Sequence, residues 1–170
     1  MENEELKLIE ELKEQYSVLS AKQGLKTSFD DYENNYGLTD TILKEGFVPK
    51  ALGIFLAFRA SEFHFSWYNF MHSLLMPQPS SMLQMEESSY IDDDLRTQIK
   101  IEMRRTMTII RKVNLVSATR DEALAVKTVD EFTGLWNNST KELVRNISSL
   151  LSDKWSEDEK DENPSSYTYG

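Results

Sequence analysis

The helical character of the chain is clearest in residues 122–151, which read EALAVKTVDEFTGLWNNSTKELVRNISSLL. At about 100° per residue, the apolar side chains of this segment fall within an arc of roughly 120°. They are Val126, Val129, Phe132, Trp136, Leu143, Val144, Ile147, Leu150 and Leu151. A single glycine, Gly134, costs about 1 kcal/mol relative to alanine and does not break so long a pattern. The segment therefore predicts a helix with one buried face, running from Thr119 to about Asp153.

Apolar residues at helical spacing also predict helices in the preceding part of the chain. Long helices are expected over residues 4–22, 49–76 and 89–116, and short amphipathic helices over residues 28–36 and 39–45. No run of residues alternates with period two for long enough to form a strand. The expected fold class is therefore all-α, a single-domain bundle of about four long helices with two short helices between the first and the second.

Turn and capping residues place the ends of these helices. Gly24, Gly37 and Gly46 each follow a predicted helix, where a residue in the left-handed conformation belongs. Pro77 and Pro79 end the second long helix and open a loop. Two capping boxes mark the next two starts, because a hydroxyl is followed three residues later by a carboxylate: Ser89 with Asp92, and Thr119 with Glu122.

The C-terminal residues differ from the rest of the chain. The helical domain is expected to span residues 1–155, with its last helix ending near Trp155. Residues 156–170 are acidic, contain an Asn-Pro-Ser-Ser sequence and lack an apolar stripe. We expect them to form a disordered acidic tail.

Composition narrows the choice of partners. The 170 residues include 19 lysines and arginines against 29 aspartates and glutamates, which gives a formal net charge of −10. This net charge disfavours binding to nucleic acids and to anionic membrane surfaces, because a protein binds phosphate groups through cationic side chains that neutralise them. Cysteine is absent, which excludes disulfides and thiolate sites and fits a reducing compartment.

No targeting or membrane segment is expected. The N-terminal residues, MENEE, are the reverse of the basic start of a signal peptide. The most apolar segment, residues 47–76, is interrupted by Arg59, Glu62 and both histidines, whereas a spanning helix requires about 20 mostly apolar residues. The sequence therefore predicts a cytoplasmic protein without a membrane span.

The sequence contains no metal or cofactor motif. A di-metal carboxylate bundle uses Glu-x-x-His elements, and neither His64 nor His72 has a carboxylate three residues before it. The three aspartates at 92–94 lack the glycine and the final glutamate of a calcium loop, and they fit a helix N-terminus instead. No glycine-rich phosphate loop is present. No metal and no cofactor are predicted.

The second long helix is the most informative for function. One apolar face contains Leu52, Leu56, Phe63, Trp67, Phe70 and Leu74, and another contains Phe58, Phe65 and Met76. Between them lies one narrow polar strip, formed by Arg59, Glu62, Ser66, Asn69 and Ser73. The strip fits the solvent-facing edge of a central helix, and it equally fits the floor of a groove that binds a polar ligand or a partner helix.

Two titratable residues are predicted to be buried. His64 projects into the apolar arc of its helix, near Ala57, Ala60 and Met71, and Glu102 lies on the inward face of the third long helix. Buried polar groups require hydrogen-bond partners, so we expect Glu102 to pair with His64 or Arg59. The pair has either a structural role or an acid–base role, because perturbed titratable pairs also occur at active sites.

One short segment resembles a family of helical enzymes. Residues 59–64, RASEFH, have the Arg-x4-His spacing of the HEPN superfamily of helical RNases. The resemblance implies RNA cleavage by Arg59 and His64 across a dimer, with Glu62 beside them as a further candidate. Ala60 stands where the family usually has a polar residue, and on an ideal helix Arg59 and His64 project about 140° apart.

A second segment, residues 130–136 with Leu143 and Ile147, is similar to the phasin-like helices of accessory subunits of polyhydroxyalkanoate synthase. That resemblance, together with the aromatic residues around Trp67, implies an alternative function in binding a lipid or a small molecule, in a pocket between helices.

The leading prediction is a non-enzymatic helical interaction or accessory protein that binds a protein partner or associates with itself. It follows from the lack of catalytic motifs and from the aromatic residues between Phe55 and Phe70, since aromatic side chains anchor interfaces as well as cores. The candidate catalytic residues of the competing enzyme hypothesis are Arg59, Glu62, His64 and Glu102.

Overall fold

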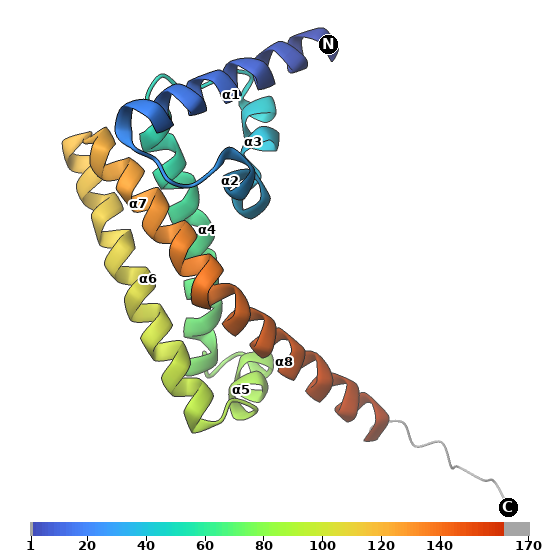
Figure 1. Ribbon diagram of the computed structural model, residues 1–170. Helices are drawn as coiled ribbons and strands as arrows, with labels where there is room; N and C mark the ends of the chain where they lie inside the picture. The colour runs from blue at the N-terminus through green and yellow to red at the C-terminus, as the bar shows by residue number, and fades with distance from the viewer. Residues whose placement is uncertain (1, 162–170) are drawn as a thin grey trace, which may run out of the picture.

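The structure is a computed structural model that describes residues 2–161 (Figure 1). Its elements are α1 (Glu2–Gln23), α2 (Phe29–Tyr36), α3 (Leu38–Glu45), α4 (Leu52–Leu75), α5 (Met82–Ser89), α6 (Asp93–Thr119), α7 (Glu122–Leu135), the π-helix η1 (Trp136–Thr140) and α8 (Lys141–Asp161). No strand occurs within this range. The all-α helical bundle predicted from the sequence is confirmed.

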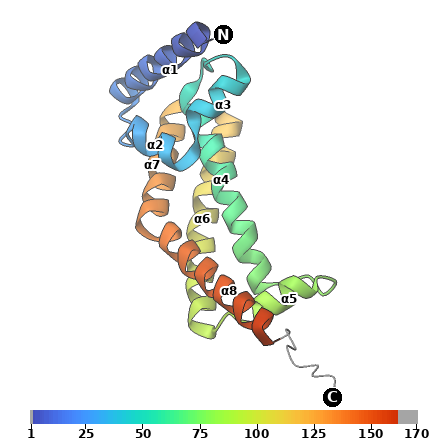
Figure 2. The same cartoon turned by 90° about the vertical axis from the view of Figure 1, so that its right-hand side faces the viewer.

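Three long helices, α4, α6 and α7, pack against one another along the length of the molecule. The segment α7–η1–α8 is helical without a break, and it bends between α7 and α8 (Figure 2). Helices α1, α2 and α3 cover one end of the bundle, and α5 lies at the other. The interior consists of two hydrophobic clusters. One lies between α1–α3 and the adjacent half of the long helices, and the other lies between α8 and the opposite half of α4 and α6.

The N-terminal helices are fixed to the bundle by aromatic rings and by one carboxylate. Tyr32 is fully buried between Tyr16 and Tyr36, and its hydroxyl donates to the carbonyl of Leu56 at 2.7 Å. The Asp130 carboxylate of α7 accepts hydrogen bonds from the backbone N–H groups of Lys26 and Thr27. These contacts hold the α1–α2 connection against α7.

The predicted starts of the last two long helices are wrong by a few residues. The N-cap of α6 is Asp92, whose carboxylate accepts from Leu95 N–H, and the N-cap of α7 is Asp121, which accepts from Leu124 N–H. Ser89 and Thr119 instead end the preceding helices, where their hydroxyls donate to carbonyls three and four residues back. The Thr119 hydroxyl also accepts from Asp121 N–H at 3.4 Å, but Asp121 precedes the first turn of α7, so this bond leaves the N–H groups of that turn to the Asp121 carboxylate.

Helix α5 was not predicted: residues 82–88 lie between the loop that Pro77 opens and the predicted helix start at Ser89. Ser81 caps it by accepting a hydrogen bond from Gln84 N–H, and the buried Ser88 hydroxyl ties it to the Leu74 carbonyl of α4. Short helices of this kind depend on tertiary contacts more than on an amphipathic pattern.

The last predicted helix differs from expectation in its interior and at its end. Residues 136–140 adopt π rather than α geometry. The helix also extends to Asp161, so the first six residues assigned to the disordered tail are helical. Residues 162–170 of that predicted tail lie outside the described range. The buried stripe is confirmed: all of its residues are buried except Leu150, which is half-buried.

No helix in residues 2–161 combines the length and the hydropathy that crossing a bilayer requires. The central helix α4 is nevertheless the most apolar one, and Gly53 brings it close to α7: a Cβ at this position would lie 3.0 Å from Glu122 Cγ and 3.1 Å from Val126 Cγ2. This close approach sets the spacing of α4 and α7 at the end of the bundle covered by α1.

Candidate functional site

The polar strip of α4 faces solvent over most of its length. Arg59 and Glu62 form an ion pair at 3.8 Å with side chains 41% and 72% exposed. Ser66 and Asn69 are exposed, and the half-buried Ser73 donates its hydroxyl to the Phe70 carbonyl. Exposure along the strip favours the interpretation as a solvent-facing edge over that as a groove floor.

His64 lies at the opposite extreme of exposure. It is fully buried, with its ring stacked on Phe132 and surrounded by Tyr36, Phe63 and Trp136. The Tyr36 hydroxyl lies 3.3 Å from Nε2. Burial lowers the pKa of His64 to about 4, because the charged imidazolium is disfavoured away from water.

The structure therefore does not bring the four candidate catalytic residues together. Arg59 and Glu62 lie on the surface of α4, His64 lies in the aromatic core, and Glu102 lies on α6. The expected pairing of Glu102 with His64 or Arg59 is wrong. Its burial was predicted correctly, with 3% of the residue exposed, but its partners come from η1 and from its own helix.

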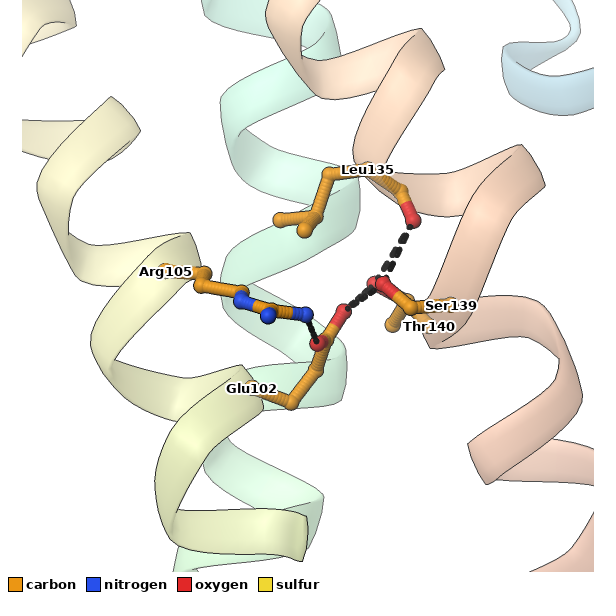
Figure 3. Close-up of polar contacts among 5 residues, drawn as sticks. All are labelled: Glu102, Arg105, Leu135, Ser139 and Thr140. Atoms are coloured by element: carbon orange, nitrogen blue, oxygen red, sulfur yellow. Dashed lines mark hydrogen bonds and ion pairs between the residues drawn. The ribbon is translucent and has the colours of Figure 1, made fainter.

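Glu102 is the centre of a polar cluster between α6 and η1 (Figure 3). Its Oε1 accepts hydrogen bonds from the Ser139 hydroxyl at 2.8 Å and from the Thr140 hydroxyl. Its Oε2 lies 3.6 Å from the Arg105 guanidinium. The cluster joins α6 to η1 through one buried carboxylate.

The π-helix explains why two consecutive hydroxyls reach the same carboxylate. In η1 each turn contains an additional residue, and the Ser139 and Thr140 hydroxyls lie between Glu102 and the Leu135 carbonyl oxygen, at 3.1 and 3.4 Å from the latter. Single-turn π segments inside α-helices occur frequently at functional sites. The π geometry of η1 therefore makes residues 136–140 a candidate functional site.

A pocket of about 360 Å³ opens between α6 and η1–α8 above this cluster. We call it the α6–η1 pocket. It is lined by Gln98, Ile101, Glu102, Arg105, Asn138, Ser139, Glu142, Leu143 and Asn146. Seven of its nine lining residues are polar or charged, and Glu102 is the only buried charge among them.

A second concave surface lies between α4 and α6. This α4–α6 groove has a volume of about 290 Å³ and is lined by Tyr68, Leu75, Lys100, Met103, Arg104 and Met107. Phe65, which is 45% exposed, stacks on Tyr68 at 5.8 Å between ring centroids, and His72 stacks on the same ring at 6.2 Å. The groove thus continues into a row of aromatic rings along α4.

Sequence reasoning did not identify Arg105, Ser139, Thr140 or the α4–α6 groove. One signal was present, because the polar residues 137–140 interrupt the apolar stripe of their helix. The groove residues belong to two separate helices, and only the packing of α4 on α6 shows that they are neighbours. Among residues 2–161, no group of three or more histidine, aspartate or glutamate side chains is arranged to hold a metal ion.

Comparisons of the chain with protein-family models, with curated proteins and with solved structures give no match.

Proposed function

We propose that this chain is a non-enzymatic helical interaction protein of the cytoplasm, and that its α4–α6 groove binds an acidic amphipathic helix of a partner protein. The observation that supports this most directly is the combination of an apolar floor with unpaired cations on one wall, in a chain whose net charge is −10.

The apolar part of the surface has the composition of a helix-binding groove. Two methionines, Met103 and Met107, and Leu75 lie beside the aromatic row that includes Phe65 and Tyr68. Methionine side chains adapt to differently shaped partners, and aromatic rings contribute strongly to interfaces. The second apolar face expected on α4 contributes to this surface, because Phe65 is exposed instead of buried in the bundle core.

The positive charges on α6 indicate which kind of partner helix the groove binds. Lys100, Arg104 and Arg111 share one face of α6 at helical spacing, and all three are exposed. None of them forms an ion pair with a carboxylate among residues 3–157, whose side chains the structure describes. On the neighbouring face, about 100° further around the same helix, Arg105 and Lys112 pair with Glu102 and Glu131. The unpaired cations therefore complement an acidic partner.

The dimensions fit a short helix. From Phe65 to Leu75 the α4 wall extends about 15 Å at 1.5 Å per residue, which is roughly three helical turns. Amphipathic helices bind in such grooves through apolar side chains at positions i, i+3 or i+4, and i+7.

The other two function classes receive less support. An enzyme of the HEPN type requires Arg59 and His64 to converge on an accessible cleft, and His64 is enclosed by aromatic rings. A lipid-binding or phasin-like bundle requires a cavity beside Trp67, which packs against Phe63, Phe70 and Trp136 and lines neither the α6–η1 pocket nor the α4–α6 groove.

A designed peptide tests the proposal. The probe is a fluorescein-labelled helix of about 15 residues with leucines at i, i+4, i+7 and i+11 and glutamates on the opposite face. We expect saturable binding by fluorescence anisotropy, weakening with salt as rim charges become screened. The double variant Lys100→Glu/Arg104→Glu should reduce the affinity by about tenfold or more, whereas Lys127→Glu/Lys141→Glu, with the same charge change at exposed positions elsewhere, should not.

Three results would contradict the proposal. The first is no binding of the acidic helix, and the second is equal binding of a control peptide in which lysines replace the glutamates. The third is concentration-dependent dimerisation in analytical ultracentrifugation that the Lys100→Glu/Arg104→Glu substitution abolishes, because the occupant of the groove would then be a second copy of the chain.

A further inference from the structure

We infer that the α6–η1 pocket binds a small organic cation, namely a primary ammonium or guanidinium group on a short alkyl chain. The pocket lies on the side of α6 that carries Glu102 and Arg105, and it shares no lining residue with the α4–α6 groove. The inference is therefore independent of the proposed interaction function.

The buried carboxylate at the base of the pocket has one oxygen that is poorly satisfied. Oε1 of Glu102 accepts two hydroxyl hydrogen bonds from Ser139 and Thr140. Oε2 contacts only Arg105 within residues 2–161, at 3.6 Å, a distance too long for a hydrogen bond. A carboxylate oxygen has room for about two donors, so Oε2 can accept from a ligand N–H group.

Arg105 is a weak counter-ion that a ligand can replace. Its side chain is 58% exposed, whereas that of Glu102 is 4% exposed. Ion pairs with so solvated a partner contribute little. A ligand ammonium that reaches Oε2 directly forms a shorter, charge-assisted hydrogen bond to a carboxylate that is itself largely out of water, while the Arg105 head group remains solvated outside.

The rest of the lining selects a cation with an apolar stem. The lining contains two carboxylates and one guanidinium. Glu142 is paired with Arg145, outside the lining, at 3.0 Å, so Glu102 is the carboxylate that attracts a cation. An anion would bring a further negative charge next to a carboxylate that cannot move into water. Ile101 and Leu143 provide apolar surface for an alkyl chain, and the amides of Gln98, Asn138 and Asn146 accept hydrogen bonds from further N–H groups.

The experiment uses the full chain with n-butylammonium and n-butylguanidinium chlorides as probes. Tetramethylammonium chloride serves as the control because it has the same charge and no N–H donor. Two-dimensional ¹H–¹⁵N NMR should show saturable shifts of the Asn138 and Ser139 signals with either probe and not with the control.

Two substitutions on neighbouring residues should act in opposite directions. Glu102→Gln keeps an acceptor for the two hydroxyls and removes the charge, so it should weaken probe binding by about tenfold or more. Arg105→Gln removes the competing guanidinium and should strengthen binding severalfold. Glu142→Gln should weaken it moderately, and Glu62→Gln, an exposed carboxylate on α4, should leave it unchanged.

The outcomes separate cleanly. Loss of binding in Arg105→Gln would show that the guanidinium does not compete with the probe and would overturn the inference, as would equal shifts with tetramethylammonium or no shifts with any probe. If Glu102→Gln fails to fold, the opposite effects expected for Arg105→Gln and Glu142→Gln still decide the matter, because neither residue is buried.

Discussion

The imidazole of His64 stacks on the ring of Phe132, with centroids 4.6 Å apart and planes inclined by 24°. The contact joins α4 to α7 at the point where α2 covers them, since Tyr36 reaches the same imidazole. It places the only fully buried histidine of residues 2–161 in an aromatic shell, and the other histidine, His72, is exposed. The two histidines therefore lie in different surroundings.

This arrangement predicts a pH-dependent loss of stability below neutrality. The folded chain holds His64 with a pKa of about 4, whereas the ordinary value is 6.5, so the unfolded chain binds more protons between these values. The free energy of unfolding should fall as pH falls through this window, by roughly 3 kcal/mol in total from His64. Urea denaturation followed by tryptophan fluorescence at several pH values measures it.

Each histidine serves as the control for the other. His64→Gln keeps a hydrogen-bonding partner for Tyr36 and should remove this component of the pH dependence. His72→Gln should leave the slope as in the wild type, because its imidazole is exposed. Equal slopes for the wild type and His64→Gln would show that the buried imidazole is not the titrating group.

Two glycines should respond oppositely to alanine. At Gly53 a methyl group would meet Val126, which is buried and β-branched, so Gly53→Ala should destabilise the protein by about 1–3 kcal/mol. At Gly134 nothing lies within 4 Å of the new Cβ, so Gly134→Ala should stabilise it by about 0.5–1 kcal/mol. Thermal unfolding monitored by circular dichroism gives both signs; a stabilising Gly53→Ala would mean that α4 and α7 are more loosely packed.

Asp130 should be more important for stability than its half-buried position indicates. Its carboxylate accepts from the backbone N–H groups of Lys26 and Thr27 and from the Thr27 hydroxyl, at distances of 2.8 to 3.1 Å. Asp130→Ala should cost about 3 kcal/mol, because hydrogen bonds to charged groups are strong and the amides lose their acceptor. Asp153→Ala, at an exposed position on α8, is the matched control in urea denaturation and should be nearly neutral.

The two hydroxyls that bind Glu102 should contribute unequally. Thr140 is fully buried, whereas Ser139 is half-buried. Thr140→Val preserves the side-chain shape and removes a donor from a buried carboxylate, so it should cost about 1–3 kcal/mol. Ser139→Ala should cost less, since water can replace the lost donor. The ranking is read from urea midpoints, and a larger loss in Ser139→Ala would contradict it.

Much of the fold could be predicted from the residues alone. The apolar stripe from Val126 to Leu151 is buried as its spacing predicts, with Leu150 half-buried. Gly37 and Gly46 adopt the left-handed conformation at helix ends, as their positions predicted. These features depend on interactions within a few residues along the chain, which the sequence displays directly.

Glu102 shows where this kind of inference stops. Helical periodicity placed it inside, and that expectation is confirmed, but periodicity contains no information about which helix lies opposite or how its turns are spaced. The partners Ser139 and Thr140 depend on the π geometry of η1, which an α-helical projection does not include. The α4–α6 groove could not be predicted either, because its lining residues, such as Tyr68 and Arg104, are distant in sequence.

The sequence by itself therefore determined which segments are helical and which side of each helix is apolar, because both follow from local backbone preference and side-chain spacing. Only the tertiary structure decided which polar groups meet across helices, where a pocket opens and which cations are left without a carboxylate. Those properties arise from how the packed helices are rotated about their axes and how far apart they lie. A small rotation, or a shift of a few ångströms, changes the partners of every polar side chain between them.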